Sequence, residues 1–133
     1  MSKEGSSTAL RSTLGRVRGL GSAKAGTHHW WMQRLTAIAL VPLTLWFVIA
    51  IVGLAAGDYA TAIAWFASPL NVALLLALVL AVFYHAQLGM RVIIEDYVHA
   101  AWLKTTTLVL LNFVMILLAL AAVSAALKVW FGA

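Results

Sequence analysis

The chain has 133 residues, of which 64% are hydrophobic and only 10% are charged, and its formal net charge is +5. A soluble domain of this length could not bury so much apolar surface, because typical soluble domains are about half apolar and about a quarter charged. The composition therefore indicates an integral membrane protein. The lack of cysteine excludes disulfides, thiolate zinc sites and cysteine-ligated iron–sulfur clusters from this chain.

Residues 1–27 are polar, rich in serine and glycine, and hold five basic residues against the single acid Glu4. We expect a basic cytoplasmic arm that lies against anionic lipid or a soluble partner. A targeting segment is the alternative, since transit peptides have a similar composition, but the apolar positions are too sparse for a good amphipathic helix. No nucleic-acid-binding motif accompanies the charge, so we expect no nucleic-acid partner.

Three apolar runs are each long enough to cross a bilayer, which takes about 20 helical residues. They cover about residues 31–56, 70–94 and 104–130, so that residues 28–133 form the membrane anchor. Pro42 lies inside the first run, where a membrane helix tolerates it better than a soluble one. Tryptophan and tyrosine fall near the ends of the runs, as in an aromatic belt. We therefore predict an all-α membrane protein with three transmembrane helices.

Basic residues set the expected orientation of these helices. The N-terminal arm and the second connection, flanked by Arg91 and Lys104, hold nearly all of them, whereas the first connection, residues 57–69, holds none. The positive-inside rule places the N-terminus and the connection at 95–103 in the cytoplasm or matrix. Lys128 falls on the other side, where its long side chain can snorkel to the interface.

His85 lies inside the second apolar run, about 15 Å from its inner end. An imidazole at this depth is costly and rare, which marks it as a candidate functional residue. It could be an axial ligand of haem iron, or it could only hydrogen-bond another helix. From the residues alone these two interpretations are about even. Gly89, one turn further on, would let a flat macrocycle approach, although glycine also serves plain helix packing.

A haem with two histidine ligands needs a second imidazole at similar depth, and this chain has none. His28, His29 and His99 all fall near the inner interface. If haem is bound, the second ligand must come from another subunit. Three helices are also a thin scaffold for enclosing a cofactor, which again favours a hetero-oligomer.

Asp96 and Tyr97 follow His85 by eleven and twelve residues, so a continuous helix places Asp96 on the face of His85, about 16 Å nearer the water. A phenol beside an acid suits a quinone site, although a solvated helix end is the simpler interpretation. Arg34, at the inner mouth of the first run, is either an ordinary basic flank or a partner for anionic groups such as haem propionates.

The run from His85 to Tyr97 resembles the signature of a known family. This family is the small hydrophobic membrane anchor of succinate dehydrogenase, the SdhD family of complex II. The family pattern is a histidine, Gly-Met four and five residues later, and Asp-Tyr at eleven and twelve. The family's segment leading into its first helix is similar to the stretch from His28 through Arg34 to Ile38. The resemblance covers roughly residues 26–133.

This resemblance implies a role for each of these residues. His85 would be an axial ligand of haem b, with the opposite ligand supplied by a second, SdhC-like anchor subunit that packs with this chain into one helical bundle. Tyr97 would hydrogen-bond ubiquinone with support from Asp96. Arg34 and His28 would lie near the haem propionates.

The resemblance also implies that no catalytic residue of succinate oxidation lies in this chain. A flavoprotein subunit would oxidise succinate, and an iron–sulfur subunit docked on the inner face would pass the electrons to quinone. A fumarate reductase anchor and a non-redox scaffold or transporter subunit are the alternatives. The doubled His28-His29 leaves open which of the two matches the family residue. The short arm after Met1 favours a bacterial inner membrane over a mitochondrial one.

Overall fold

The computed structural model describes residues 24–132, with side chains from residue 26 onward. Within this range the chain forms helices only: α2 (Lys24–Ala55), α3 (Tyr59–Ala67), α4 (Pro69–Tyr97) and α5 (Ala101–Trp130). Three segments are long and apolar enough to cross a membrane, namely Gly26–Ala55, Pro69–Tyr97 and Ala101–Trp130. The prediction of an all-α membrane protein with three membrane helices is confirmed. Most of the predicted N-terminal arm, residues 1–23, lies outside the described residues.

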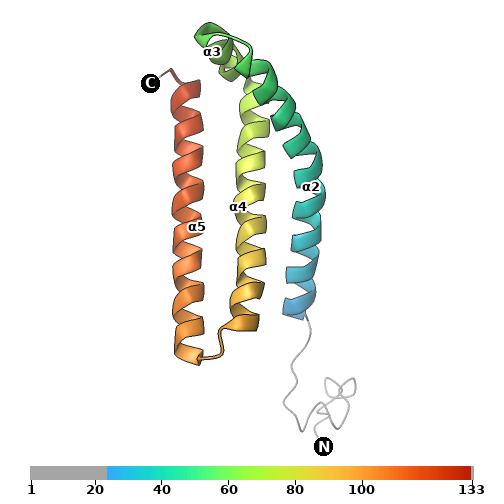
Figure 1. Cartoon of the computed structure of the whole chain (residues 1–133), viewed down its shortest axis with the longest axis vertical. Helices are drawn as coiled ribbons and strands as arrows, with labels where there is room; N and C mark the ends of the chain where they lie inside the picture. The colour runs from blue at the N-terminus through green and yellow to red at the C-terminus, as the bar shows by residue number, and fades with distance from the viewer. Residues whose placement is uncertain (1–23, 133) are drawn as a thin grey trace, which may run out of the picture.

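The first membrane helix begins earlier than its apolar run, because α2 starts at Lys24 rather than near residue 31. Hydropathy detects only the apolar part of a helix, whereas backbone hydrogen bonds can continue through the polar residues before it. His28 and His29 therefore lie on the first turns of α2, and residues 24–27, which we predicted as part of the arm, belong to the same helix. The helix also continues through Pro42, and Figure 1 shows α2 bending toward α4 in its second half.

The first connection contains a short helix that the sequence pattern did not predict. Asp58 caps α3, because its carboxylate accepts hydrogen bonds from the backbone N–H and the hydroxyl of Thr61. Trp65 of α3 then stacks on Trp46 of α2, with ring centroids 5.7 Å apart. An aspartate at the N-cap, whose carboxylate accepts from the backbone N–H three residues later, is a local signal for such a helix start.

The second connection is shorter than the predicted 95–103, because α4 continues to Tyr97 and α5 begins at Ala101. Lys104 of α5 reaches back across the turn and donates a hydrogen bond of 2.9 Å to the backbone carbonyl of Glu95. A lysine ammonium at a helix C-terminus satisfies a free carbonyl and favours the negative end of the helix dipole. This bond fixes the turn at the end of α4.

Helix α4 is the centre of the bundle, since both α2 and α5 pack along it (Figure 1). The start of α2, the end of α4 and the start of α5 lie at one end of the bundle, and α3 lies at the other. Few side chains of residues 26–132 are buried between the helices. The buried apolar ones are Val72, Leu78, Leu88, Leu111 and Ala126. Large apolar side chains such as Ile38, 69% exposed, and Leu117, 64% exposed, require lipid or partner helices to cover them.

Candidate functional site

His85 projects from α4 toward α2 and is half-buried between the two helices. Its Nδ1 atom lies 2.9 Å from the hydroxyl oxygen of Thr36. Its Nε2 atom lies 3.3 Å from the side-chain amide nitrogen of Gln33. Both ring nitrogens of the imidazole are therefore in contact with polar groups in the N-terminal half of the neighbouring helix.

Thr36 is the buried polar residue of this interface, only 9% exposed. Its hydroxyl oxygen lies 2.7 Å from the backbone carbonyl of Met32 and 3.1 Å from that of Gln33. A threonine hydroxyl often donates to the carbonyl four residues earlier in a helix. Gln33 and Thr36 were not among the residues that we expected from the sequence to contact His85. The sequence did offer one signal for such a contact: two polar residues lie three positions apart near the start of an apolar helix and so share one of its faces.

Two buried polar atoms near this site have no hydrogen-bond partner within the described residues. They are Oε1 of Gln33 and Nε2 of His29. Buried polar atoms are normally paired, so unpaired ones mark places where another group is expected. Gly89 lies one turn along from His85, and a Cβ added there would meet Gln33 Nε2 at 3.8 Å, an ordinary contact. Packing within this chain therefore does not require glycine at position 89.

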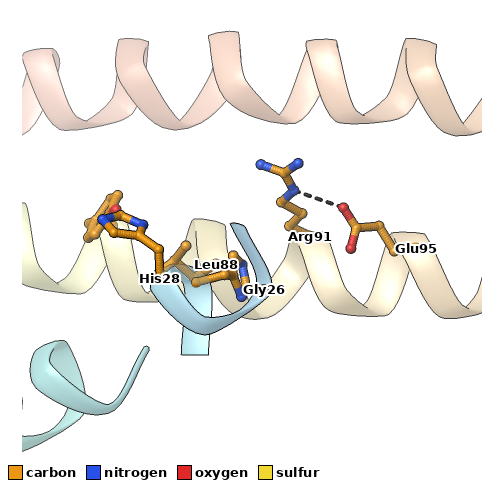
Figure 2. A pocket seen from close by; sticks show the side chains of 7 residues that line it. Gly26, His28, Leu88, Arg91 and Glu95 are labelled. Carbon is orange, nitrogen blue, oxygen red and sulfur yellow. Dashed lines mark hydrogen bonds and ion pairs between the residues drawn. The ribbon is translucent and has the colours of Figure 1, made fainter. Parts of the chain in front are cut away.

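A cavity of about 520 Å³ opens between the first turns of α2 and the C-terminal half of α4, and its lining includes Tyr84 and Leu88 on either side of His85 in the chain but not His85 itself. Its lining consists of Gly26, His28, His29, Tyr84, Leu88, Arg91 and Glu95. Figure 2 shows Gly26 and His28 on the α2 side and Leu88, Arg91 and Glu95 on α4. Arg91 Nε donates to Glu95 Oε1 over 2.8 Å, and both side chains are about half exposed. This pair neutralises one arginine charge at the cavity rim.

The structure separates His28 from Arg34, which the resemblance places near the same anionic groups. Six residues of helix turn the chain well past one and a half turns, so the two side chains leave α2 on different faces. His28 lines the cavity, whereas Arg34 is exposed and its guanidinium carbon lies 5.5 Å from the ring centroid of Trp30. Arg34 is not among the residues that line the cavity. A cation over a tryptophan face is a stable arrangement at a membrane surface.

Asp96 and Tyr97 are the last two residues of α4. The helix is unbroken from His85 to its end, so Asp96 shares the face of His85 about 16 Å further along, as the spacing predicts. Both side chains are exposed, and Tyr97 is 78% exposed. Neither forms a side-chain hydrogen bond with another described residue. Neither lines the cavity beside His85.

The chain matches the sequence profile of the succinate dehydrogenase/fumarate reductase transmembrane subunits over residues 8–126. It belongs to this family. The succinate dehydrogenase hydrophobic membrane anchor subunit of Rickettsia bellii is 37% identical over 108 residues, 81% of this chain and 86% of that protein. That of Rickettsia conorii is 34% identical over 117 residues, 87% and 93% of the two chains. That of Paracoccus denitrificans is 32% identical over 81 residues, 61% and 63%.

The resemblance inferred from the sequence is therefore confirmed, and the chain is one of the succinate dehydrogenase hydrophobic membrane anchors. Within this family context, α4 is the helix that holds the whole signature, from His85 through Gly89 and Met90 to Asp96 and Tyr97. Family membership also implies that the chain works in a complex with other subunits in a membrane. The relatives are subunits of succinate dehydrogenase, and this chain corresponds to their membrane anchor.

Proposed function

We propose that this chain anchors a succinate:quinone oxidoreductase, supplies His85 as one axial ligand of haem b, and supplies Tyr97 and Asp96 to the quinone site. The observation that carries the proposal is a single unbroken helix, α4, with an imidazole at membrane depth and a phenol beside an acid at its end. Membership of the succinate dehydrogenase/fumarate reductase transmembrane family supports this proposal.

The polar groups around His85 suit a histidine that binds haem iron. Imidazole is a common ligand of haem iron, and a ligating histidine usually donates its other ring N–H to a neighbouring acceptor. Thr36 provides such a neighbour at Nδ1, while the polar neighbour of Nε2 among the described residues is the amide of Gln33. A bound haem b supplies a one-electron reservoir beside the path to quinone. The opposite ligand would come from a second, SdhC-like anchor subunit, because the described part of this chain has no other histidine at that depth.

His28 lines the cavity beside His85, where an imidazole can hydrogen-bond a haem propionate. Arg34 could join it only with its side chain moved from Trp30, against which it now lies. Guanidinium binds carboxylates well, so a propionate could draw it from this surface position. Of the two, His28 has the better placement in the structure.

The end of α4 fits a quinone site in a different way. Tyr97 presents its hydroxyl outward and can donate a hydrogen bond to a quinone carbonyl. Reduction of quinone to quinol takes two electrons and two protons, so the site needs contact with water. Asp96 is exposed beside it and can relay protons to the reduced oxygen or orient its partner. The electrons would arrive from the iron–sulfur subunit.

The ends of the bundle suggest how the enzyme is arranged. Arg34, Arg91 and Lys104 lie toward the end where α4 meets α5, which the positive-inside rule places in the cytoplasm. We propose that the iron–sulfur and flavoprotein subunits dock on this end, and that the second anchor subunit covers exposed apolar faces. The Rickettsia relatives are bacterial, which favours a bacterial inner membrane. Their names favour succinate oxidation over fumarate reduction.

The test is a reduced-minus-oxidised visible spectrum of the purified complex for wild type, His85→Ala and His99→Ala. We expect a b-type band in wild type and in His99→Ala, because His99 lies exposed in the connection after α4, and a lost or shifted band in His85→Ala. Co-purification of all subunits controls for assembly. An unchanged band in His85→Ala would exclude His85 as a ligand. A complex without any haem band or quinone reductase activity would favour a non-redox scaffold.

A further inference from the structure

A neutral imidazole offers only one ring nitrogen with a free lone pair, and the other nitrogen carries the proton. Which nitrogen can bind a metal is therefore decided by the hydrogen bond made at the other one. For His85 the two candidates are Nδ1, beside Thr36, and Nε2, beside Gln33. The question is which of these two nitrogens the surrounding chain leaves free.

The hydroxyl of Thr36 has a single proton to give. Its oxygen lies 2.7 Å from the Met32 carbonyl oxygen, shorter than its 2.9 Å distance to His85 Nδ1. Two oxygens at 2.7 Å without a proton between them would repel each other, so the proton lies on the line to Met32. The Thr36 oxygen must then accept at its other contact. The donor there is the Nδ1–H of His85.

With the proton on Nδ1, Nε2 of His85 carries the free lone pair. Its polar neighbour among the described residues is the Gln33 amide nitrogen, which donates to it over 3.3 Å. That distance is beyond the usual range for an N–H donor, so the bond is weak and easily displaced. The carbonyl oxygen of the same amide is buried without a partner among the described residues, so this weak bond is the side-chain hydrogen bond that holds the Gln33 amide there.

We infer that Thr36 is a positioning residue for the haem ligand, which holds His85 in the Nδ1–H form and leaves Nε2 to bind the iron. This inference rests on the proposed function. Thr36 is almost fully buried, so water cannot replace the hydrogen bond that it makes. A partner of this kind also makes the imidazole a stronger electron donor, which stabilises ferric over ferrous haem.

The test compares Thr36→Val, Thr36→Ser and Thr106→Val in the assembled complex. Valine keeps the shape of threonine but cannot accept from Nδ1–H, whereas serine keeps the hydroxyl. Thr106→Val is the matched control, because the Thr106 hydroxyl also bonds the carbonyl four residues earlier, that of Trp102, at 2.9 Å, but faces no histidine. The readouts are the haem content after purification and dilution, and the midpoint potential of haem b from a spectroscopic titration.

We expect Thr36→Val to weaken haem binding by about 10- to 100-fold and to raise the midpoint potential, as for the loss of other hydrogen-bond partners of ligating histidines. Thr36→Ser and Thr106→Val should match wild type in both. Wild-type binding and potential in Thr36→Val, together with haem loss in His85→Ala, would overturn the role of Thr36 alone. Full haem retention in His85→Ala would instead overturn the proposed function, and the role of Thr36 with it.

Discussion

Gln87 on α4 donates a side-chain hydrogen bond of 2.6 Å to Oδ1 of Asn112 on α5. Both residues lie in the middle of membrane helices, where amide groups without partners are costly. The bond ties the central helix to α5 on the side away from the His85 contact with α2. This hydrogen bond is therefore a polar contact between two otherwise apolar helices.

We predict that Gln87→Leu and Asn112→Leu each destabilise the contact between α4 and α5. A double-mutant cycle should give a coupling of about 0.6 kcal/mol and at most about 1.7 kcal/mol, the range found for hydrogen bonds between membrane helices. The measurement is the thermal unfolding of the purified complex in detergent.

Ser124→Ala is the control for this cycle, because the Ser124 hydroxyl bonds only the Ala121 carbonyl of its own helix, at 2.9 Å. It should show no coupling to Gln87→Leu. Strictly additive effects of Gln87→Leu and Asn112→Leu would mean that the bond contributes nothing to the stability of the purified complex.

The second prediction concerns the hydroxyl of Tyr97. In Tyr97→Phe we expect succinate–quinone reductase activity to fall by roughly two- to tenfold, the equivalent of losing one hydrogen bond of about 0.5–1.5 kcal/mol in the transition state. Succinate-dependent reduction of a soluble dye should stay at the wild-type rate, because that reaction bypasses the anchor.

Tyr59→Phe is the matched control for Tyr97→Phe. Tyr59 is 81% exposed at the start of α3, at the opposite end of the bundle from Tyr97. Its substitution should leave both activities unchanged. Wild-type quinone reduction in Tyr97→Phe would remove this hydroxyl from the quinone site.

The third prediction is a pH dependence at the connection between α2 and α4. The backbone N–H and hydroxyl of Thr61 hydrogen-bond the Asp58 carboxylate and hold the pKa of Asp58 below its usual value of 3.8. Because the folded pKa is the lower one, the cap stabilises α3 fully above the unfolded pKa. This stabilisation is lost as the pH falls through the folded pKa.

Hydrogen exchange of the α3 amides, corrected for intrinsic rates, is the measurement for Asp58. Protection should be constant near neutral pH and should fall in wild type below about pH 4. Asp58→Asn can still cap the helix but does not titrate, so its protection should be insensitive to acid. Equal acid sensitivity of Asp58→Asn and wild type would show that another group is responsible.

The amino-acid sequence by itself determined the three membrane helices and the placement of the signature on one of them. A backbone in lipid must satisfy its own hydrogen bonds, so a long apolar run allows little except a helix. The spacing from His85 to Asp96 then fixes their shared face on a continuous helix. The sequence also contains the N-cap of α3, Asp58, although hydropathy alone did not indicate this helix.

Only the tertiary structure decided which residues meet His85. Thr36 is 49 residues away in the chain, and its contact depends on how α2 and α4 are rotated against each other. These helices are apolar nearly all round, so the hydrophobic pattern favours no particular face for packing. Helix geometry alone places His28 and Arg34 on different faces of α2, but the packing of α2 on α4 decided which of the two faces the cavity. Pairing and rotation of the helices come from side-chain packing between distant segments, which no local pattern specifies.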